Sequence, residues 1–533
     1  MNNESFSKLV STFFTPHRDE LVEIFTELLD AIEAEGHLPP GGIMSRNYET
    51  AQANPEIHTI PGNLKDARDA IFPFFWGTDG WASELHIENV KGPASYASLI
   101  GAIACLLKNP NLCVDTYCQR SNELEVKAIT SLANLIFYHT ASPWGVFTMG
   151  GTISNLYGGK IGIEKVCPGA MQQGLGTQPV VGFVSDAAHY SNATLAGWLG
   201  MGTNQLLRIP TDDSISMRMD SLESGLEQAY REGKKVAFAI GTFGTTDAYG
   251  VDDIKTMRTL LDDVANRYGE PTPHLHVDAA VGWVSCFLSE YNVDTNPLGL
   301  NPSILPLVQK AQSAARGFQF ADSVTIDFHK MGWGHYPSSA FIVNRREDLK
   351  YLLRDKKEAP YFCEADYRHD PALFTLECSR PAIGPYAVMA SLNGIGLQGY
   401  QMLIGHAMEL AWKLKSRLES MDNCKVLNMD TFGPSVVWWV LPKGRDAKAI
   451  YQQIREGTLS EQQCDRYFAE VRRMFEKRQQ TMKHGKDPLL SFTTSMGFKP
   501  QGRSLPAWKA VFFSPRTRDE HIDAILNSIE DLV

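Results

Sequence analysis

Apolar residues at helical spacing open the chain. Residues 1–35 place them three and four positions apart, beginning with Phe6, Leu9 and Val10. Residues 92–109 (GPASYASLIGAIACLLKN) are small and apolar almost throughout, which is typical of a buried helix. The pattern therefore predicts an N-terminal segment made of helices.

From about residue 120 the pattern changes to short apolar runs that end in small, polar or charged residues. The runs are PVVGFVSD, KVAFAIGTFG, HLHVDAAVG and SVTIDFHK. Helical patterns such as DSLESGLEQAYREG and IKTMRTLLDDVANRYG lie between them. Strands that alternate with helices predict an α/β fold with a mostly parallel sheet covered on both faces. Ligands bind at the carboxyl ends of the strands in such sheets, so we expect a site where these runs end.

After about residue 395 a long helical pattern leads into SVVWWVLP and, much later, AWKAVFFSP. These elements predict a smaller α+β unit. We therefore expect a helical segment over residues 1–120, a large α/β domain over 121–395 and a small C-terminal α+β domain over 396–533.

Composition narrows the function classes. Hydrophobic residues make up 43% of the 533-residue chain and charged residues 21%, as in an ordinary globular protein. The formal net charge of −11 disfavours a nucleic-acid partner. No apolar run reaches membrane-spanning length, and the N-terminus lacks a secretory signal pattern. The nine cysteines form no C-x-x-C pair, which disfavours a metal site or a disulfide framework, and we expect a cytoplasmic protein.

Lys330 ends one of the apolar runs, in ADSVTIDFHKMGWGHYPSS (321–339). A lysine at a strand end either reaches solvent or is held in a site as a Schiff-base amine, and the second role needs surroundings that lower its pKa. Asp278 ends HLHVDAAVGW, where it is either a cap of the next helix or a carboxylate that faces a pyridinium nitrogen. The residues at the ends of the other predicted strands help to decide whether Lys330 and Asp278 belong to a site.

Three further segments carry candidate groups. FTMGGTISNLYGG (147–159) places two glycines and Thr152 before a helical pattern, which suits a phosphate group, although most such glycine pairs are turns. His189 lies in VSDAAHYSNATLAGW, where it either packs in the core or stacks on an aromatic cofactor. Thr246 follows the run KVAFAIGTFG, at a position where its hydroxyl could bond a phenolic oxygen.

Together these segments follow an order, GGT, HYS, GTT, VDAA and HK, that resembles the group II pyridoxal-phosphate-dependent amino acid decarboxylases. GGTISNLYG is similar to the glutamate decarboxylase form of the phosphate loop, and SVTIDFHKMG to the bacterial tyrosine and archaeal aspartate/tyrosine decarboxylase form. The resemblance spans roughly residues 60–420. It implies the aspartate-aminotransferase-like architecture (fold type I) and a homodimer with active sites near the interface, in which the N-terminal segment forms part of the dimer contact.

The resemblance also implies roles for individual residues. Lys330, His189 and Tyr361 would act in catalysis, with Tyr361 returning a proton after carbon dioxide leaves. Arg380 would hold the substrate carboxylate, and Tyr336 and His86 are further candidates for the substrate pocket. No metal ligand is implied. The implied contacts with pyridoxal 5'-phosphate are Lys330, Asp278, Ala280, His189, Gly151, Thr152, Thr246 and His329.

Two features depart from the family pattern. Asp327 and Phe328 stand where many relatives have Asn-Pro, and the acid puts a direct phosphate contact in doubt. The stretch 285–320 is an insertion that would shape either the pocket or the dimer contact. Trp333 and Tyr336 lean towards an aromatic substrate, although core packing would explain the same residues.

The expected reaction is decarboxylation of an aromatic or acidic L-amino acid to its amine. Alternatives are a related carbon–carbon lyase, an aldehyde synthase, and a non-catalytic relative. An aldehyde synthase would lack the loop tyrosine, and the retained Lys330, Asp278 and His189 speak against a non-catalytic protein.

Overall fold

The computed structural model describes residues 3–15, 18–35, 48–53, 59–75, 83–139, 142–358, 369–483 and 486–532. Its central feature is a seven-stranded sheet in the order β1-β7-β6-β5-β4-β2-β3. Only β7 runs against its neighbours, so the predicted mostly parallel sheet is confirmed. The strands are β1 (Trp144–Thr148), β2 (Val180–Ser185), β3 (Leu206–Ile209), β4 (Lys235–Thr242), β5 (His274–Asp278), β6 (Ser323–Asp327) and β7 (Ser339–Val343).

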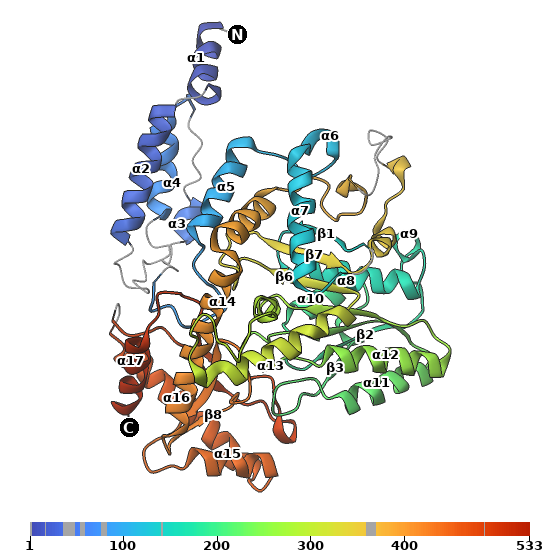
Figure 1. Cartoon of the computed structure of the whole chain (residues 1–533), viewed down its shortest axis with the longest axis vertical. Coiled ribbons are helices and arrows are strands. Elements are labelled where there is room, and N and C mark those ends of the chain that lie inside the picture. The colour runs from blue at the N-terminus through green and yellow to red at the C-terminus, as the bar shows by residue number, and fades with distance from the viewer. Residues whose placement is uncertain are drawn as a thin grey trace.

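Helices cover both faces of this sheet (Figure 1). Alternate residues of β4 show why: Phe238 and Ile240 pack into a cluster with residues of α8 and α10, whereas Ala239 packs with residues of α11 and α12. A strand buried on both faces is apolar throughout, as the sequence pattern indicated. The helices of this unit are α6 (Asp115–Cys118), α7 (Arg120–Leu135), α8 (Gly151–Val166), α9 (Ala170–Gln173), α10 (Ser191–Trp198), α11 (Met219–Arg231), α12 (Ile254–Tyr268) and α13 (Leu305–Ala315).

The N-terminal helices stand at one side of the molecule, and α1 reaches beyond the main body (Figure 1). The helices predicted within 1–35 and 92–109 are confirmed. Their bounds, with those of the two helices between them, are α1 (Asn3–Phe14), α2 (Arg18–Glu35), α3 (Tyr48–Ala53), α4 (Leu64–Phe75) and α5 (Tyr96–Lys108).

The C-terminal part forms a separate antiparallel sheet, in the order β10-β11-β9-β8, around a core that includes the fully buried Trp438, Trp439 and Trp508. The helix α14 (Ile383–Glu419) leads into it and is broken at Gly396, whose φ is 69°. This break adjoins the predicted domain boundary at 395/396, and the three-part division stays a prediction. The other elements are β8 (Cys424–Val426), β9 (Ser435–Val440), α15 (Ala447–Glu456), α16 (Glu461–Thr481), β10 (Ser491–Thr493), β11 (Ala507–Val511) and α17 (Asp519–Glu530).

The stretch 285–320 folds into short helices and α13, and buries Val308, Ala311 and Ala315 in the main core. Within the described part of the chain, no helix combines the length and the hydropathy needed to cross a membrane.

Candidate active site

The carboxyl ends of β4, β5 and β6 meet the start of α8 around one cavity, with about 460 Å³ of empty space, part of it open to solvent. Convergence at this edge is what a mostly parallel sheet predicts. The cavity is lined by Gly151, Thr152, Asn155, His189, Ser191, Thr242, Gly244, Thr246, Asp278, Ala280, Val281, Asp327 and Lys330.

Lys330 lies in the cavity rather than in solvent. Its Nζ is 3.0 Å from Oδ2 of Asp327, whose other oxygen accepts a hydrogen bond of 2.5 Å from the Ser339 hydroxyl. Burial lowers the pKa of Lys330, but the charges of Asp327 and Asp278 outweigh that effect, and the pKa stands above its ordinary value. The amine is thus held as a cation in this arrangement.

The N-terminus of α8 faces the same space. Gly150 precedes the helix with a φ of 139°, which favours glycine, and no side chain caps the first turn. A Cβ at Gly151 would lie 2.8 Å from Oδ2 of Asp327, so the carboxylate rests against the helix start. Uncapped N–H groups and the helix dipole together favour an anion here, and Asp327 supplies one from within the chain.

Asp278 lines the cavity at the end of β5. Its Oδ2 accepts a hydrogen bond of 2.8 Å from Nδ2 of Asn155, and its Oδ1 accepts one of 3.2 Å from the backbone N–H of Ala280. Both oxygens are therefore oriented by donors on two separate elements.

His189 also lines the cavity, between the end of β2 and the start of α10. Its Nδ1 accepts a hydrogen bond of 3.2 Å from the backbone N–H of Ser191, which assigns the ring proton to Nε2. Burial lowers the pKa of His189, with the charges of Asp278 and Lys330 acting in opposite directions. A neutral imidazole that presents an N–H is the form that can donate to a ligand. Thr246 also lines the cavity.

His329 is buried beside the cavity without lining it. Its Nδ1 accepts a hydrogen bond of 3.3 Å from the backbone N–H of Ser338, and its ring lies 3.8 Å from that of Tyr336. Tyr336 is 52% exposed, whereas Trp333 is buried and donates to the carbonyl of Phe513. Core packing therefore accounts for Trp333.

Arg380 and His86 do not line the cavity. Arg380 is neither on the surface nor in the cavity, because its guanidinium forms a buried two-bond pair with Glu125, at 2.7 and 2.8 Å. His86 is buried beside the C-terminal unit, bridging to Leu489. Tyr361 lies outside the described residues.

Asn155 is one lining residue that the sequence reading missed. It lies one turn into α8, in GGTISNLYGG, where a buried amide close to the predicted phosphate loop was the available signal. Thr242 and Val281 were also missed, because nothing in the sequence distinguishes them from other residues near the ends of strands.

Known proteins resemble the chain along most of its length. The family model described as the pyridoxal-dependent decarboxylase conserved domain matches residues 40–441. The acidic amino acid decarboxylase GADL1 of Xenopus tropicalis is 27% identical over 394 residues, which cover 73% of this chain and 67% of that protein.

Solved structures share the fold. Mouse CSAD superposes with a TM-score of 0.76 at 19% identity, covering 96% of this chain and 99% of the other. The Catharanthus roseus tryptophan decarboxylase superposes with a TM-score of 0.74 at 16% identity, covering 97% of each chain. Both likenesses concern the fold alone.

Proposed function

Because the chain belongs to the pyridoxal-dependent decarboxylase family and is a pyridoxal-phosphate-dependent amino acid decarboxylase, we propose that its substrate is an L-amino acid with an acidic side chain. The support for this class is the likeness to the acidic amino acid decarboxylase GADL1. The aromatic alternative loses the support of Trp333, which is a core residue.

The residues around the cavity fit the cofactor. Lys330 supplies the amine that attaches it, and the start of α8 at Gly151 and Thr152 would hold its phosphate, next to the Asp327 carboxylate that lies against the same helix start. We assign Asp278 as the partner of the ring nitrogen, supported by its place in the cavity lining and its two fixed oxygens. When bound, pyridoxal phosphate supplies an electron-accepting ring for the electron pair that stays on the substrate carbon when carbon dioxide leaves.

The other residues orient the reactants. We assign the Nε2–H of His189 to a hydrogen bond with the substrate carboxylate, and Ala280 to contact with the flat ring. Tyr361 keeps its proposed role as the proton donor to the substrate carbon. Among the described lining residues Lys330 is the sole cation, so the group that recognises an acidic side chain belongs outside them, either elsewhere in this chain or on a second copy.

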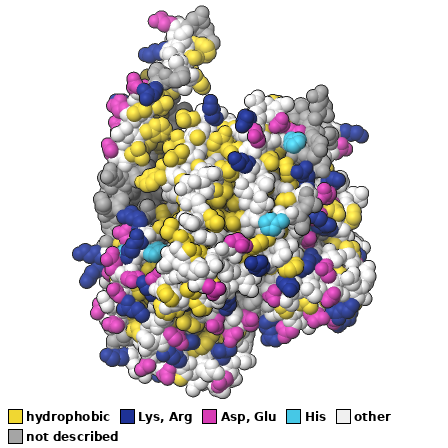
Figure 2. Space-filling view, in the orientation of Figure 1, with side chains coloured by type: hydrophobic (Ala, Val, Ile, Leu, Met, Phe, Trp, Pro, Cys, Tyr) yellow, Lys and Arg dark blue, Asp and Glu magenta, His cyan; other side chains and the backbone are white. Residues whose placement is uncertain are grey.

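A homodimer is part of the proposal. Large hydrophobic side chains are exposed on α1, α2 and α5, and Figure 2 shows them gathered over the N-terminal helices and the adjoining body. Patches of this kind on a soluble chain mark interaction sites. The exposed members include Phe6, Phe14, Val22, Phe25, Leu29, Ile100, Leu106 and Leu107.

The test is carbon dioxide release by the purified holoenzyme from L-aspartate, L-cysteine sulfinate, L-glutamate, L-tyrosine and L-tryptophan. We expect the highest kcat/KM with one of the three acids, and no release by Lys330→Ala. A preference for an aromatic substrate would overturn the acidic class. Ammonia and hydrogen peroxide formed together with carbon dioxide would indicate an aldehyde synthase.

A further inference from the structure

A line of buried polar side chains runs behind Asp278, between the central sheet and α8. His274, His276 and Asp278 alternate along β5 with apolar residues, so they share one face of the strand. Ser323 and Thr325 stand beside them on β6, which pairs His276 with Ser323 and Asp278 with Thr325. All five side chains are buried.

The near end of this line reaches the cavity. Asn155 donates from Nδ2 to Asp278, while its Oδ1 accepts from the Thr325 hydroxyl over 2.7 Å and lies 3.1 Å from Nε2 of His276. Gly158, one turn further along α8, makes room for the imidazole, since a Cβ there would lie 2.6 Å from Nδ1 of His276. The helix is therefore shaped around this ring.

The line continues without a gap to a cation. Oγ of Ser323 lies 2.7 Å from Nδ1 of His276 and 2.7 Å from Nε2 of His274. Nδ1 of His274 lies 3.1 Å from Nζ of Lys165, which pairs with Asp348 at 2.9 Å. A connected path thus joins the Lys165 ammonium group to the carboxylate that lines the cavity.

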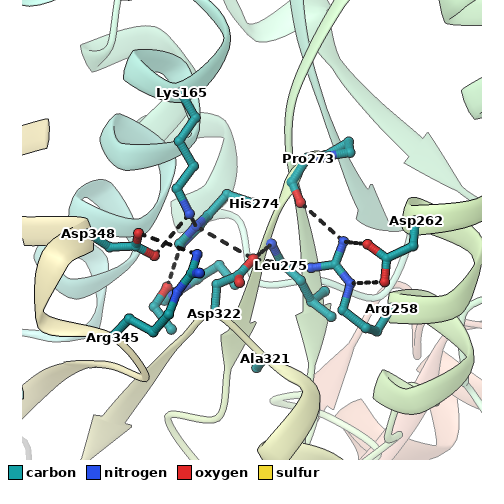
Figure 3. A network of polar contacts seen from close by, with 12 residues as sticks. Lys165, Arg258, Asp262, Pro273, His274, Leu275, Ala321, Asp322, Arg345 and Asp348 are labelled. Carbon is teal, nitrogen blue, oxygen red and sulfur yellow. Dashed lines mark hydrogen bonds and ion pairs between the residues drawn. The ribbon is translucent and has the colours of Figure 1, made fainter. Parts of the chain in front are cut away.

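The far end is a compact ionic cluster (Figure 3). His274, Asp322 and Asp348 bring ligand atoms close enough together for a metal ion. Lys165 points into the same group, and Arg345 lies beside it. Since the ammonium group already supplies the positive charge, we assign no metal there.

The cation sets the direction of every hydrogen bond. An ammonium group only donates, so His274 accepts at Nδ1 and donates from Nε2 to Ser323. The serine hydroxyl then donates to Nδ1 of His276, whose Nε2–H faces two acceptors, the Asn155 oxygen at 3.1 Å and the Thr325 hydroxyl oxygen at 3.0 Å. Burial lowers the pKa of His274 and that of His276, the latter to about 3, which keeps both rings neutral as this pattern requires.

We propose that Lys165, His274, Ser323 and His276 are positioning residues that act through Asn155 on Asp278. Hydrogen bonds that all point one way polarise one another, so this line of hydrogen bonds makes Asn155 a stronger donor to Asp278. The Asp278 carboxylate is thereby held in the orientation that faces the ring nitrogen of the cofactor. The proposal rests on the assignment of Asp278 made under the proposed function.

A network that served only to stabilise the fold would treat all cofactor analogues alike. Two ligands separate the roles: pyridoxal phosphate, and its 1-deaza analogue, in which carbon replaces the ring nitrogen. Dissociation constants for both ligands are measured with the wild type, Ser323→Ala and Lys165→Met. Ser323→Ala interrupts the line of hydrogen bonds by removing one oxygen. Lys160→Met is the matched control, since Lys160 lies on the same helix as Lys165. Its ammonium group pairs with Glu164 at 2.8 Å and takes no part in the line of hydrogen bonds behind Asp278.

The wild type is expected to prefer pyridoxal phosphate over the deaza analogue. In Ser323→Ala and Lys165→Met we expect this preference to fall about fivefold, the worth of one ordinary hydrogen bond, and in Lys160→Met to persist. Equal weakening of both ligands, or an unchanged preference in Ser323→Ala, overturns the proposal. If the wild type bound both ligands equally well, the assignment of Asp278 as the partner of the ring nitrogen would be wrong. If Lys165→Met does not fold, Ser323→Ala alone decides the proposal.

Discussion

The pair of Lys330 and Asp327 governs how readily the cofactor attaches. Only a neutral amine is nucleophilic, and Asp327 helps to hold the pKa of Lys330 above its ordinary value. Attachment should therefore speed up as the pH rises. In Asp327→Asn the pKa of Lys330 falls, and we expect the midpoint of the attachment profile to move about one unit towards lower pH.

Borohydride trapping of the protein-bound cofactor at a series of pH values measures this midpoint. Ser339→Ala is the control, because it removes the hydrogen bond of 2.5 Å to Asp327 but leaves the charge. A profile unchanged in Asp327→Asn would mean that the carboxylate does not act on the amine.

Phe328 shows why the departure from the family pattern was not interpretable from sequence. Its backbone N–H donates to the carbonyl of Ser338 over 2.9 Å, which a proline could not do. Its ring is fully buried, 5.2 Å from that of Trp283. Both contacts depend on tertiary structure, whereas strand-end residues such as Asp278 stand out in the pattern itself.

At the scale of elements, the buried pair of Arg380 and Glu125 ties α7 to β1 and to the segment before α14. Arg380 also donates to the carbonyl of Phe147 over 2.9 Å, and Glu125 accepts from the backbone N–H of the same residue. Removing one partner of such a pair leaves an uncompensated buried charge, and we expect Arg380→Met to lower the free energy of unfolding by about 3–5 kcal/mol.

Denaturant unfolding of the unliganded protein measures this loss. The double variant Glu125→Gln/Arg380→Met should recover part of it, since the lone charge is gone. Unimpaired stability together with a raised KM for the substrate would contradict the structural role and restore the substrate contact first expected of Arg380.

The helices and strands could be predicted from the sequence more fully than the contacts between them. The four apolar runs became β2, β4, β5 and β6, because strands buried on both faces leave a clear signature. Arg380 could not be placed, because its partner is 255 residues away and nothing local identifies Glu125.

At the scale of the molecule, the exposed hydrophobic face of the N-terminal helices predicts a dimer. Val22 and Phe25 on α2 are 53% and 46% exposed. Charges placed there would oppose burial in an interface, so we expect the wild type to sediment at twice the chain mass of 59.3 kDa and Val22→Asp/Phe25→Asp to sediment as a monomer.

Sedimentation velocity at micromolar concentration makes the comparison, with Asp30→Asn as a control for an exposed polar residue on the same helix. A double variant that remains a dimer would place the interface elsewhere.

The buried polar line behind Asp278 also bears on how the chain folds. The apolar face of β5 and β6 does little to distinguish one alignment from the next, because shifting by two residues returns a similar face to the core. A slip by two residues would place Thr325 or Ala321 opposite His276 in place of Ser323, and would break the line of buried hydrogen bonds that leads to Asp278. These side chains therefore help to fix the register of β5 against β6. The register that satisfies their hydrogen bonds is also the one that orients the Asp278 carboxylate towards the cavity.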